Sequence, residues 1–227
     1  MMSHDNKLDN PVWHSLNETH AGFSINYDNL KCYQPDYCPF GGYNPGNSIS
    51  NYLEEYAALI DNFFIVGEKP DFPLILELKN ELVCLQMTID RQPKTPLNEN
   101  IIRLNGVYEQ ELFELVNLVQ PGYFRRKTVL LGDYYGIFKN NVLVSVTGER
   151  MKMNELTEIS AVVTHPGHVG KGYAKQLMAY VINKIVEENK LPFLHVAETN
   201  TGAIHLYQKM GFTTRRKISF WNFHKKL

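Results

Sequence analysis

The chain has 227 residues, which is enough for one large domain or two small ones with a substantial core. Its formal net charge of −1 excludes the clustered basic surface that nucleic-acid-binding proteins usually carry. No apolar run reaches the length of a membrane helix, and the first residues lack the apolar core of a secretory signal. Three cysteines without a Cys-x-x-Cys pair favour a reducing compartment. We therefore expect a cytoplasmic protein that binds neither nucleic acid nor membrane.

The first 95 residues carry the weaker patterns. Aromatic residues, prolines and glycines over Tyr33–Gly46 predict a long loop. A helix is expected near Ser48–Asp61, and strands are expected at Phe63–Gly67 and Leu82–Ile89.

The segment Arg91–Asn100, with two prolines, is the predicted linker. We expect residues 1–95 to form a small α/β domain packed beside a larger domain of residues 101–227. Two alternatives stay open for the small domain: a degenerate partial copy of the fold that follows it, or a lid without a ligand of its own.

Residues 101–227 alternate between strand and helix patterns, which is typical of an α/β unit. The Asn140–Asn141 pair predicts a hairpin turn, because asparagine tolerates positive φ. The expected strands are Ile101–Leu104, Tyr134–Lys139, Val142–Gly148, Glu158–Val163, Phe193–Ala197 and 213–224. The expected helices are Glu109–Val119, a long helix from Tyr173, and Thr201–Lys209.

A glycine-rich turn joins one of these strands to the long helix. The β-branched run Ile159–Val163 ends at Pro166, and the apolar residues from Tyr173 onward follow helical spacing. Gly170 and Gly172 permit positive φ and a close approach of ligand to backbone. Free N–H groups at a helix N-terminus bind anions, phosphate above all. The turn therefore predicts a phosphate site, with a purely structural turn as the alternative.

Two nucleotide motifs do not fit this turn. A P-loop would need Ser or Thr after the lysine, and Lys171 is followed by Gly172. The dinucleotide fingerprint would need glycine or alanine where Lys175 stands.

A third pattern fits. The stretch Val169–Ala174 resembles motif A of the GNAT superfamily of N-acetyltransferases, Gln/Arg-x-x-Gly-x-Gly/Ala, with Val169 replacing the usual polar residue. Downstream, Asn200–Phe212 matches every place of the family pattern Asn-x-x-Ala-x-x-Leu-Tyr-x-x-x-Gly-Phe. Glu158 holds the acidic position eleven residues before motif A. The resemblance covers residues 101–227.

The resemblance implies an acetyltransferase fold, with a mixed, mostly antiparallel sheet flanked by helices, and acetyl-CoA as co-substrate. The pyrophosphate would lie on the glycine turn, and the pantetheine arm would run along backbone groups of a strand that splays from its neighbour. The implied contact residues are Val162, Val163, Thr164, Val169, Gly170, Lys171, Gly172, Tyr173, Ala174, Asn200 and Tyr207.

Two catalytic roles are implied by the same resemblance. Glu158 would act as the base for the acceptor amine, or alternatively fix its strand or bind the substrate ammonium. Tyr207 would protonate the leaving thiolate, because a tyrosine keeps its proton at neutral pH; the alternative is a packed core tyrosine.

Several other polar residues attract weaker expectations. His195 and Glu198 are candidates for acceptor contact, and Glu149 and Arg150 are expected to form an ion pair beside the acceptor. His165 and His168 lack the accompanying ligands of a metal site, so no metal is expected.

We expect an acetyl-CoA-dependent N-acetyltransferase acting on a primary amine of a small molecule or amino-acid-like acceptor, as a monomer or homodimer. The alternative is a non-catalytic CoA-binding regulatory module. The acceptor pocket is expected from the first helix of the larger domain, the loop between the fold's last two strands, and the N-terminal half.

Overall fold

The computed structural model describes residues 4–46 and 48–226. Eleven strands in this described part form one sheet, in the order β1-β2-β3-β4-β11-β5-β10-β9-β8-β7-β6. The strands are β1 (Ser24–Tyr27), β2 (Leu30–Tyr33), β3 (Phe40–Tyr43), β4 (Asn62–Val66), β5 (Leu76–Thr88), β6 (Ile101–Arg103), β7 (Tyr134–Lys139), β8 (Val142–Lys152), β9 (Leu156–Thr164), β10 (Leu191–Ala197) and β11 (Thr213–Lys225). The α-helices are α1 (His4–Asp9), α2 (Pro11–Asn17), α3 (Ser50–Ala57), α4 (Glu109–Val119), α5 (Tyr173–Glu187) and α6 (Thr201–Met210).

The strand order is similar on the two sides of the central pair β11 and β5, with four strands beyond β11 and five beyond β5. On one side β3 and β4 are parallel and joined through α3, and on the other side β9 and β10 are parallel and joined through α5. Each half also contains an antiparallel meander, β1-β2-β3 or β7-β8-β9. The N-terminal half thus repeats the order of the C-terminal half from β7 onward, without a counterpart of β6 or α6.

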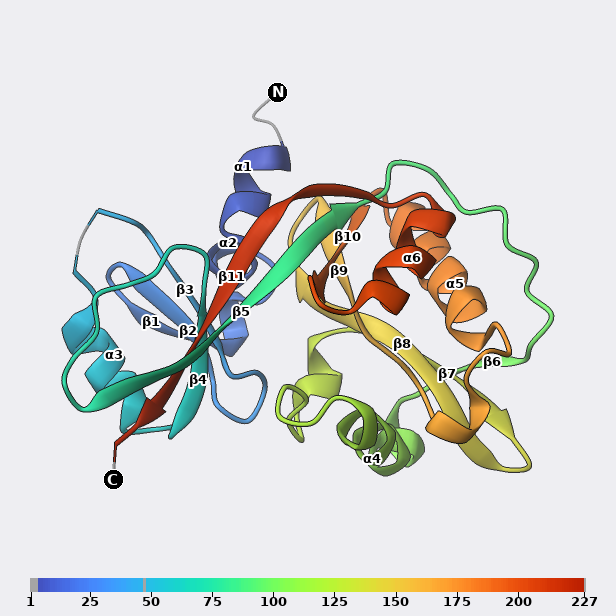
Figure 1. Ribbon diagram of the computed structural model, residues 1–227, viewed down its shortest axis with the longest axis horizontal. Helices are drawn as coiled ribbons and strands as arrows, with labels where there is room; N and C mark the ends of the chain where they lie inside the picture. Colours follow the sequence, from blue (N-terminus) through green and yellow to red (C-terminus); the bar gives the residue numbers. More distant parts are fainter. Residues whose placement is uncertain (1–3, 47, 227) are drawn as a thin grey trace.

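The two halves exchange their last strands. β5 follows the N-terminal half in sequence but pairs with β10, while β11 ends the C-terminal half and pairs with β4. β5 and β11 also pair with each other along most of their length and run diagonally between the two lobes (Figure 1). One sheet therefore runs through both halves, and the expected division at residues 95–101 stays a prediction.

The segment between β5 and β6 has no regular secondary structure, in keeping with its linker composition. It runs past α5, where the backbone N–H groups of Asn98 and Glu99 both donate to Gln176 Oε1.

Helices cover both faces of the C-terminal half. Neighbouring residues of a strand point to opposite faces. Leu143 of β8 packs in the core under α4, whereas Val144 packs in the core under α5 and α6. α4 therefore lies on the face opposite α5 and α6, as Figure 1 also shows.

Most elements of residues 101–227 were predicted correctly. α4 has the predicted bounds, and the hairpin of β7 and β8 turns at Asn140 and Asn141, with φ of 50° and 63°. Helix α5 begins at Tyr173 as predicted.

The prediction of a loop over the whole of Tyr33–Gly46 was wrong, because Phe40–Tyr43 forms the buried strand β3. The glycines that suggested a loop are needed for packing. A Cβ on Gly41 would lie 2.7 Å from Cys32 Sγ, and one on Gly42 would lie 2.7 Å from the backbone nitrogen of Trp13.

The expected loop between two final strands was also wrong. After α6, the described chain forms one 13-residue strand, β11. The position beside β10 is occupied by β5 from the N-terminal half.

Candidate active site

The two central strands of the C-terminal half separate part-way along their length. β9 and β10 pair from Leu156 to Ile159 only, so the later residues of both strands diverge. Ala161 has a φ of 50°, and the register of β9 against β8 shifts at this point, which identifies a β-bulge. Bulges redirect side chains and backbone groups, and this one lies where the strands part.

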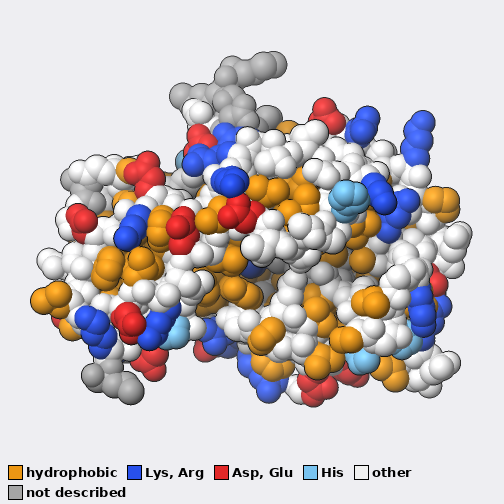
Figure 2. All heavy atoms as spheres, in the orientation of Figure 1, with side chains coloured by type: hydrophobic (Ala, Val, Ile, Leu, Met, Phe, Trp, Pro, Cys, Tyr) orange, Lys and Arg blue, Asp and Glu red, His pale blue; other side chains and the backbone are white. Residues whose placement is uncertain are grey.

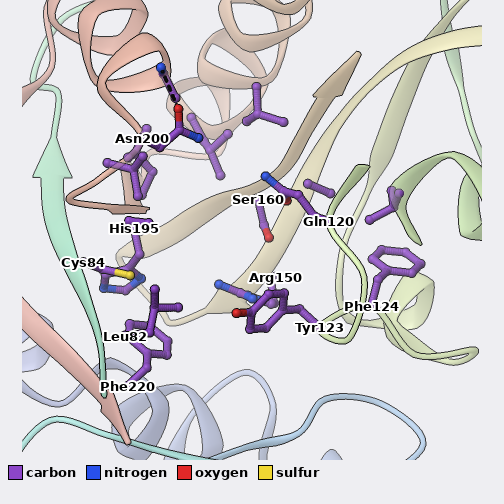
Figure 3. A pocket seen from close by; sticks show the side chains of 18 of the residues that line it. Leu82, Cys84, Gln120, Tyr123, Phe124, Arg150, Ser160, His195, Asn200 and Phe220 are labelled. Atoms are coloured by element: carbon purple, nitrogen blue, oxygen red, sulfur yellow. Dashed lines mark hydrogen bonds between the residues drawn. The ribbon is translucent and has the colours of Figure 1, made fainter. Parts of the chain in front are cut away.

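A cavity of about 310 Å³ occupies the region of this separation (Figure 3). Residues of β9, β10 and α6 form one side of the cavity. The segment after α4 and residues of the N-terminal half form the other side. Figure 3 shows Arg150, His195 and Ser160 on its floor, with Tyr123 in front of Arg150. Figure 2 shows hydrophobic side chains gathered in the middle of this face, where the two halves meet.

The edge of β9 toward this gap offers backbone donors. The N–H of His165 donates to Val144 of β8 at 2.8 Å. N–H groups alternate between the two sides of an antiparallel strand. Val163 N–H therefore faces β8, whereas the N–H groups of Val162 and Thr164 face away from β8 toward the gap. Of the three residues predicted to make backbone contacts, Val162 and Thr164 direct their N–H groups into the gap, and Val163 does not.

The glycine turn follows β9. Gly170 and Gly172 have φ of 78° and 77°, and Gly172 is the N-cap of α5. A Cβ at either position would meet no atom within 4 Å, so backbone conformation alone requires glycine here. The surrounding space is open, and Val169 is exposed. An anion of the size of a pyrophosphate can therefore reach the N-terminus of α5.

Helix α6 presents two of the predicted residues to the cavity. Asn200 Oδ1 accepts from the N–H of Ala203 at 3.1 Å, so Asn200 is the N-cap of α6. Tyr207 also lines the cavity and is 6% exposed. Burial raises its pKa well above the usual value. The hydroxyl therefore keeps its proton at neutral pH. It has no hydrogen-bond partner among the described residues, so it can donate to a ligand.

Glu158 lies beneath the cavity in a network of charged and polar groups. Arg150 binds it with two hydrogen bonds, Nε to Oε2 at 2.8 Å and Nη2 to Oε1 at 2.7 Å. His195 Nδ1 lies 2.8 Å from Oε1, and the N–H of Met151 points to Oε2 at 3.4 Å. Burial alone would raise the pKa of this carboxyl, but Arg150 and His195 together lower the pKa to about 2. An incoming amine thus meets Arg150 or His195 before it meets the carboxylate.

The expected ion pair between Glu149 and Arg150 was wrong. Consecutive residues of β8 point to opposite faces. Glu149 instead pairs with Lys152 at 2.7 Å, and Arg150 pairs with Glu158.

The hydrogen-bond chain continues from His195 into the N-terminal half. Gln86 of β5 is the direct cross-strand partner of His195. Gln86 Nε2 donates to the carbonyl of Leu8 at 2.8 Å and lies 3.1 Å from His195 Nε2. This arrangement makes His195 Nε2 an acceptor and Nδ1 the donor to Glu158. Sequence reasoning missed Gln86, because no local signal indicates which strand lies beside β10.

The other singled-out residues lie outside this cavity. His165 Nδ1 accepts from the N–H of Gly167 at 3.1 Å, within the turn. Glu198 forms an ion pair with Lys217 at 2.6 Å. The described residues contain no group of three or more metal-ligating side chains. No helix in the described ranges is both long and apolar enough to span a bilayer.

Comparisons with known proteins agree with this geometry. The family model described as FR47-like protein matches residues 134–221, from β7 into β11. A solved structure from Novosphingobium aromaticivorans, described as an acetyltransferase of the GNAT family, has 28% identity and a TM-score of 0.83 over 97% of this chain and 99% of its own.

The chain therefore resembles the GNAT superfamily in fold and in sequence.

More distant GNAT structures share the fold over both halves. A GCN5-related N-acetyltransferase-like protein from Streptococcus suis has 14% identity and a TM-score of 0.66, over 98% of this chain and 97% of its own. A GCN5-related N-acetyltransferase from Kribbella flavida has 12% identity and a TM-score of 0.64, over 100% of this chain and 97% of its own. No curated protein matches the sequence.

On this likeness the chain is an acyltransferase, and an acyl-CoA is the donor expected for the fold. The residues present fit such a donor. The turn at Gly170 and Gly172 is open to an anion, and the gap between β9 and β10 has room for an extended arm beside free backbone donors.

Proposed function

We propose that the chain is an N-acetyltransferase that moves the acetyl group of acetyl-CoA to a primary amine of a small-molecule or amino-acid-like acceptor. One observation carries the proposal. A single cavity extends from Asn200 and Tyr207 at the α6 side to Arg150 and Tyr123 at the opposite side. Donor and acceptor can therefore meet in one cavity, which supports direct attack in a ternary complex.

The donor would be held mainly by backbone groups. The residues Val169, Gly170, Lys171, Gly172, Tyr173 and Ala174 form the turn and the first residues of α5, where N–H groups and the helix dipole favour a pyrophosphate. Val162 and Thr164 supply N–H groups to the pantetheine arm, and Asn200 lies beside its path. Val163, paired with Val146 of β8, would support this strand from the other side.

The reaction requires that the amine nitrogen attack the thioester carbon and that the C–S bond break with its electron pair on sulfur. Tyr207 can donate a proton to the developing thiolate, because its hydroxyl is protonated and the residue lines the cavity. The amine must lose a proton as the new bond forms. The role of Glu158 as base stays a prediction, and its contacts with Arg150 and His195 mean that it would receive the proton indirectly.

The alternative to direct attack is a covalent acetyl-enzyme intermediate, which needs a nucleophilic side chain. Cys84 lines the cavity and is the candidate nucleophile. Burial raises the pKa of this thiol to about 12, so the nucleophilic thiolate is scarce at neutral pH. This favours direct transfer to the amine.

The proposal is tested by incubating the protein with acetyl-CoA and a panel of amines while a thiol reagent reports CoA release. We expect amine-dependent release, an N-acetylated product by mass spectrometry and initial-rate lines that intersect. Cys84→Ser should retain turnover. Parallel initial-rate lines with loss of activity in Cys84→Ser would contradict direct transfer, and release without any acetylated amine would contradict the proposed reaction.

A further inference from the structure

We propose that Arg150 binds a carboxylate of the acceptor, so that the substrates are amino acids with an apolar side chain rather than simple amines or polyamines. This inference rests on the proposed function and names the substrate class for the same site.

The guanidinium of Arg150 has one edge bound and one edge open. Nε and Nη2 donate to Glu158, and Nη1 has no hydrogen-bond partner in the described part of the chain. Arg150 nevertheless lines the cavity. The edge formed by Nη1 and the second hydrogen of Nη2 therefore remains for a ligand. Two parallel N–H groups of this kind match the two oxygens of a carboxylate.

A row of side chains holds the guanidinium in this orientation. Gln86, His195, Glu158 and Arg150 come from the adjacent strands β5, β10, β9 and β8, and each contacts the next by a hydrogen bond. The ring of Phe40 lies against the guanidinium, with Cζ 4.7 Å from the ring centroid. An arginine fixed on one edge and one face loses little further freedom when it binds a ligand.

The charge of the cavity also favours an anion beside Arg150. No aspartate or glutamate is among the described residues that line it. A polycationic acceptor would find no counter-charge in contact with it. Glu158 is neutralised by Arg150 and covered by it, at 1% side-chain exposure.

The walls nearest Arg150 are apolar, and both halves of the chain contribute to them. Phe40 of β3 and Leu82 of β5 belong to the N-terminal half, and Phe220 lies on the exchanged strand β11. Tyr123 and Phe124 close the other side. An apolar side chain of the acceptor would bury surface against these residues. The N-terminal half thus supplies walls of the acceptor pocket.

The first test compares three ligands on the unaltered protein in the presence of CoA: L-phenylalanine, L-phenylalaninamide and 2-phenylethylamine. All three keep the amine and the ring, and only the first has a carboxylate. We expect calorimetry to show at least about tenfold tighter binding of phenylalanine, the scale of a charge-assisted bidentate contact. With acetyl-CoA, the difference should appear in KM more than in kcat. Equal binding of the three would overturn the proposal.

The second test removes the anchor while keeping the buried site neutral. Arg150→Gln alone would leave Glu158 as an unpaired buried charge and could prevent folding. The double variant Arg150→Gln, Glu158→Gln removes both charges together. We expect it to lose the preference for phenylalanine over its amide and to retain CoA binding. The matched control is Arg126→Gln, because Arg126 is exposed and does not line the cavity; it should retain the preference.

The binding measurement separates this inference from the proposed function. Carboxylate-selective binding without any acetylated product would refute the proposed reaction and leave the anchor supported. Acetylation of all three amines with equal affinity would support the reaction and refute the anchor. A double variant that binds CoA and still prefers the carboxylate would also refute it.

Discussion

At the scale of single residues, Tyr207 shows how burial prepares a proton donor. Its ring packs in the apolar core beneath α5 and α6, while the residue also lines the cavity. Burial disfavours the tyrosinate and raises the pKa, so the proton is present when negative charge develops on sulfur. A packed core residue and a catalytic acid are therefore compatible descriptions of this side chain.

We predict that Tyr207→Phe lowers kcat about ten- to a thousandfold, the scale of one general acid. The ring and its packing stay, so the dissociation constant of acetyl-CoA should change little. Tyr180→Phe is the matched control, since Tyr180 lies on α5, packs edge-on against Tyr135 and does not line the cavity. Full activity of Tyr207→Phe would mean that another group protonates the thiolate.

His20 makes the stability of the protein depend on pH. It is 1% exposed, lies 2.8 Å from the hydroxyl of Tyr33 through Nδ1, and donates from Nε2 to the carbonyl of Leu131 at 2.9 Å. Burial lowers its pKa from 6.5 to about 4. Between pH 4 and pH 6.5, His20 is therefore protonated in the unfolded chain but neutral in the folded protein. The contribution of His20 to the free energy of unfolding therefore has its full value above pH 6.5. It declines as the pH falls toward 4, by up to about 3 kcal/mol.

We predict that the free energy of unfolding in urea falls between pH 7.5 and pH 5, and that His20→Gln reduces this fall. Glutamine can replace the donor to Leu131, but it does not titrate. A smaller dependence should remain from His14, whose pKa burial also lowers. His205→Gln, an exposed position on α6, should behave as the unaltered protein does. An unchanged pH dependence in His20→Gln would assign the effect to other groups.

At the scale of elements, the turn between β9 and α5 converts backbone geometry into an anion site. Gly172 ends the turn with positive φ and begins the helix as its N-cap. The first N–H groups of a helix have no intrahelical partner, and the helix dipole adds partial positive charge at the same end.

We predict that Gly172→Asp weakens acetyl-CoA binding at least about tenfold more than Gly172→Asn does. Both replacements tolerate positive φ and can cap the helix, so their difference isolates the negative charge beside the pyrophosphate. Calorimetry at two salt concentrations is the measurement, and the difference should shrink at high salt. Equal affinities of the two variants would remove the pyrophosphate from this turn.

At the scale of the whole molecule, the exchange of β5 and β11 joins the two halves. Without β5, β10 would lose its antiparallel neighbour and β11 would lose its longest pairing. The same exchange brings Gln86 to His195 and Leu82 to the cavity. The N-terminal half is therefore part of the sheet that carries the site.

We predict a single cooperative unfolding transition. Tryptophan fluorescence reports on Trp13 of α2 and Trp221 of β11, and far-UV circular dichroism reports mainly on the longer helices α4, α5 and α6. The two probes should give coincident urea curves, because the sheet is continuous. Two separated midpoints would show that the halves unfold independently.

The sequence by itself determined the features that depend on near neighbours in the chain. The glycine turn at Gly170 and Gly172 and the start of α5 at Tyr173 lie within one local pattern, so spacing and residue type were sufficient. The bounds of α4 and the hairpin at Asn140 and Asn141 followed from periodicity and turn chemistry in the same way.

Only the tertiary structure decided which strands lie side by side. The strands that carry Gln86, His195, Glu158 and Arg150 are far apart in sequence, and no local signal encodes their order in the sheet. The buried strand at Gly41 and Gly42 likewise depends on close packing against Cys32 and Trp13, whereas its composition indicates a loop. Charge pairing, acceptor walls and strand exchange all depend on such contacts. They form only when the whole sheet does, because each needs a partner that another part of the chain supplies.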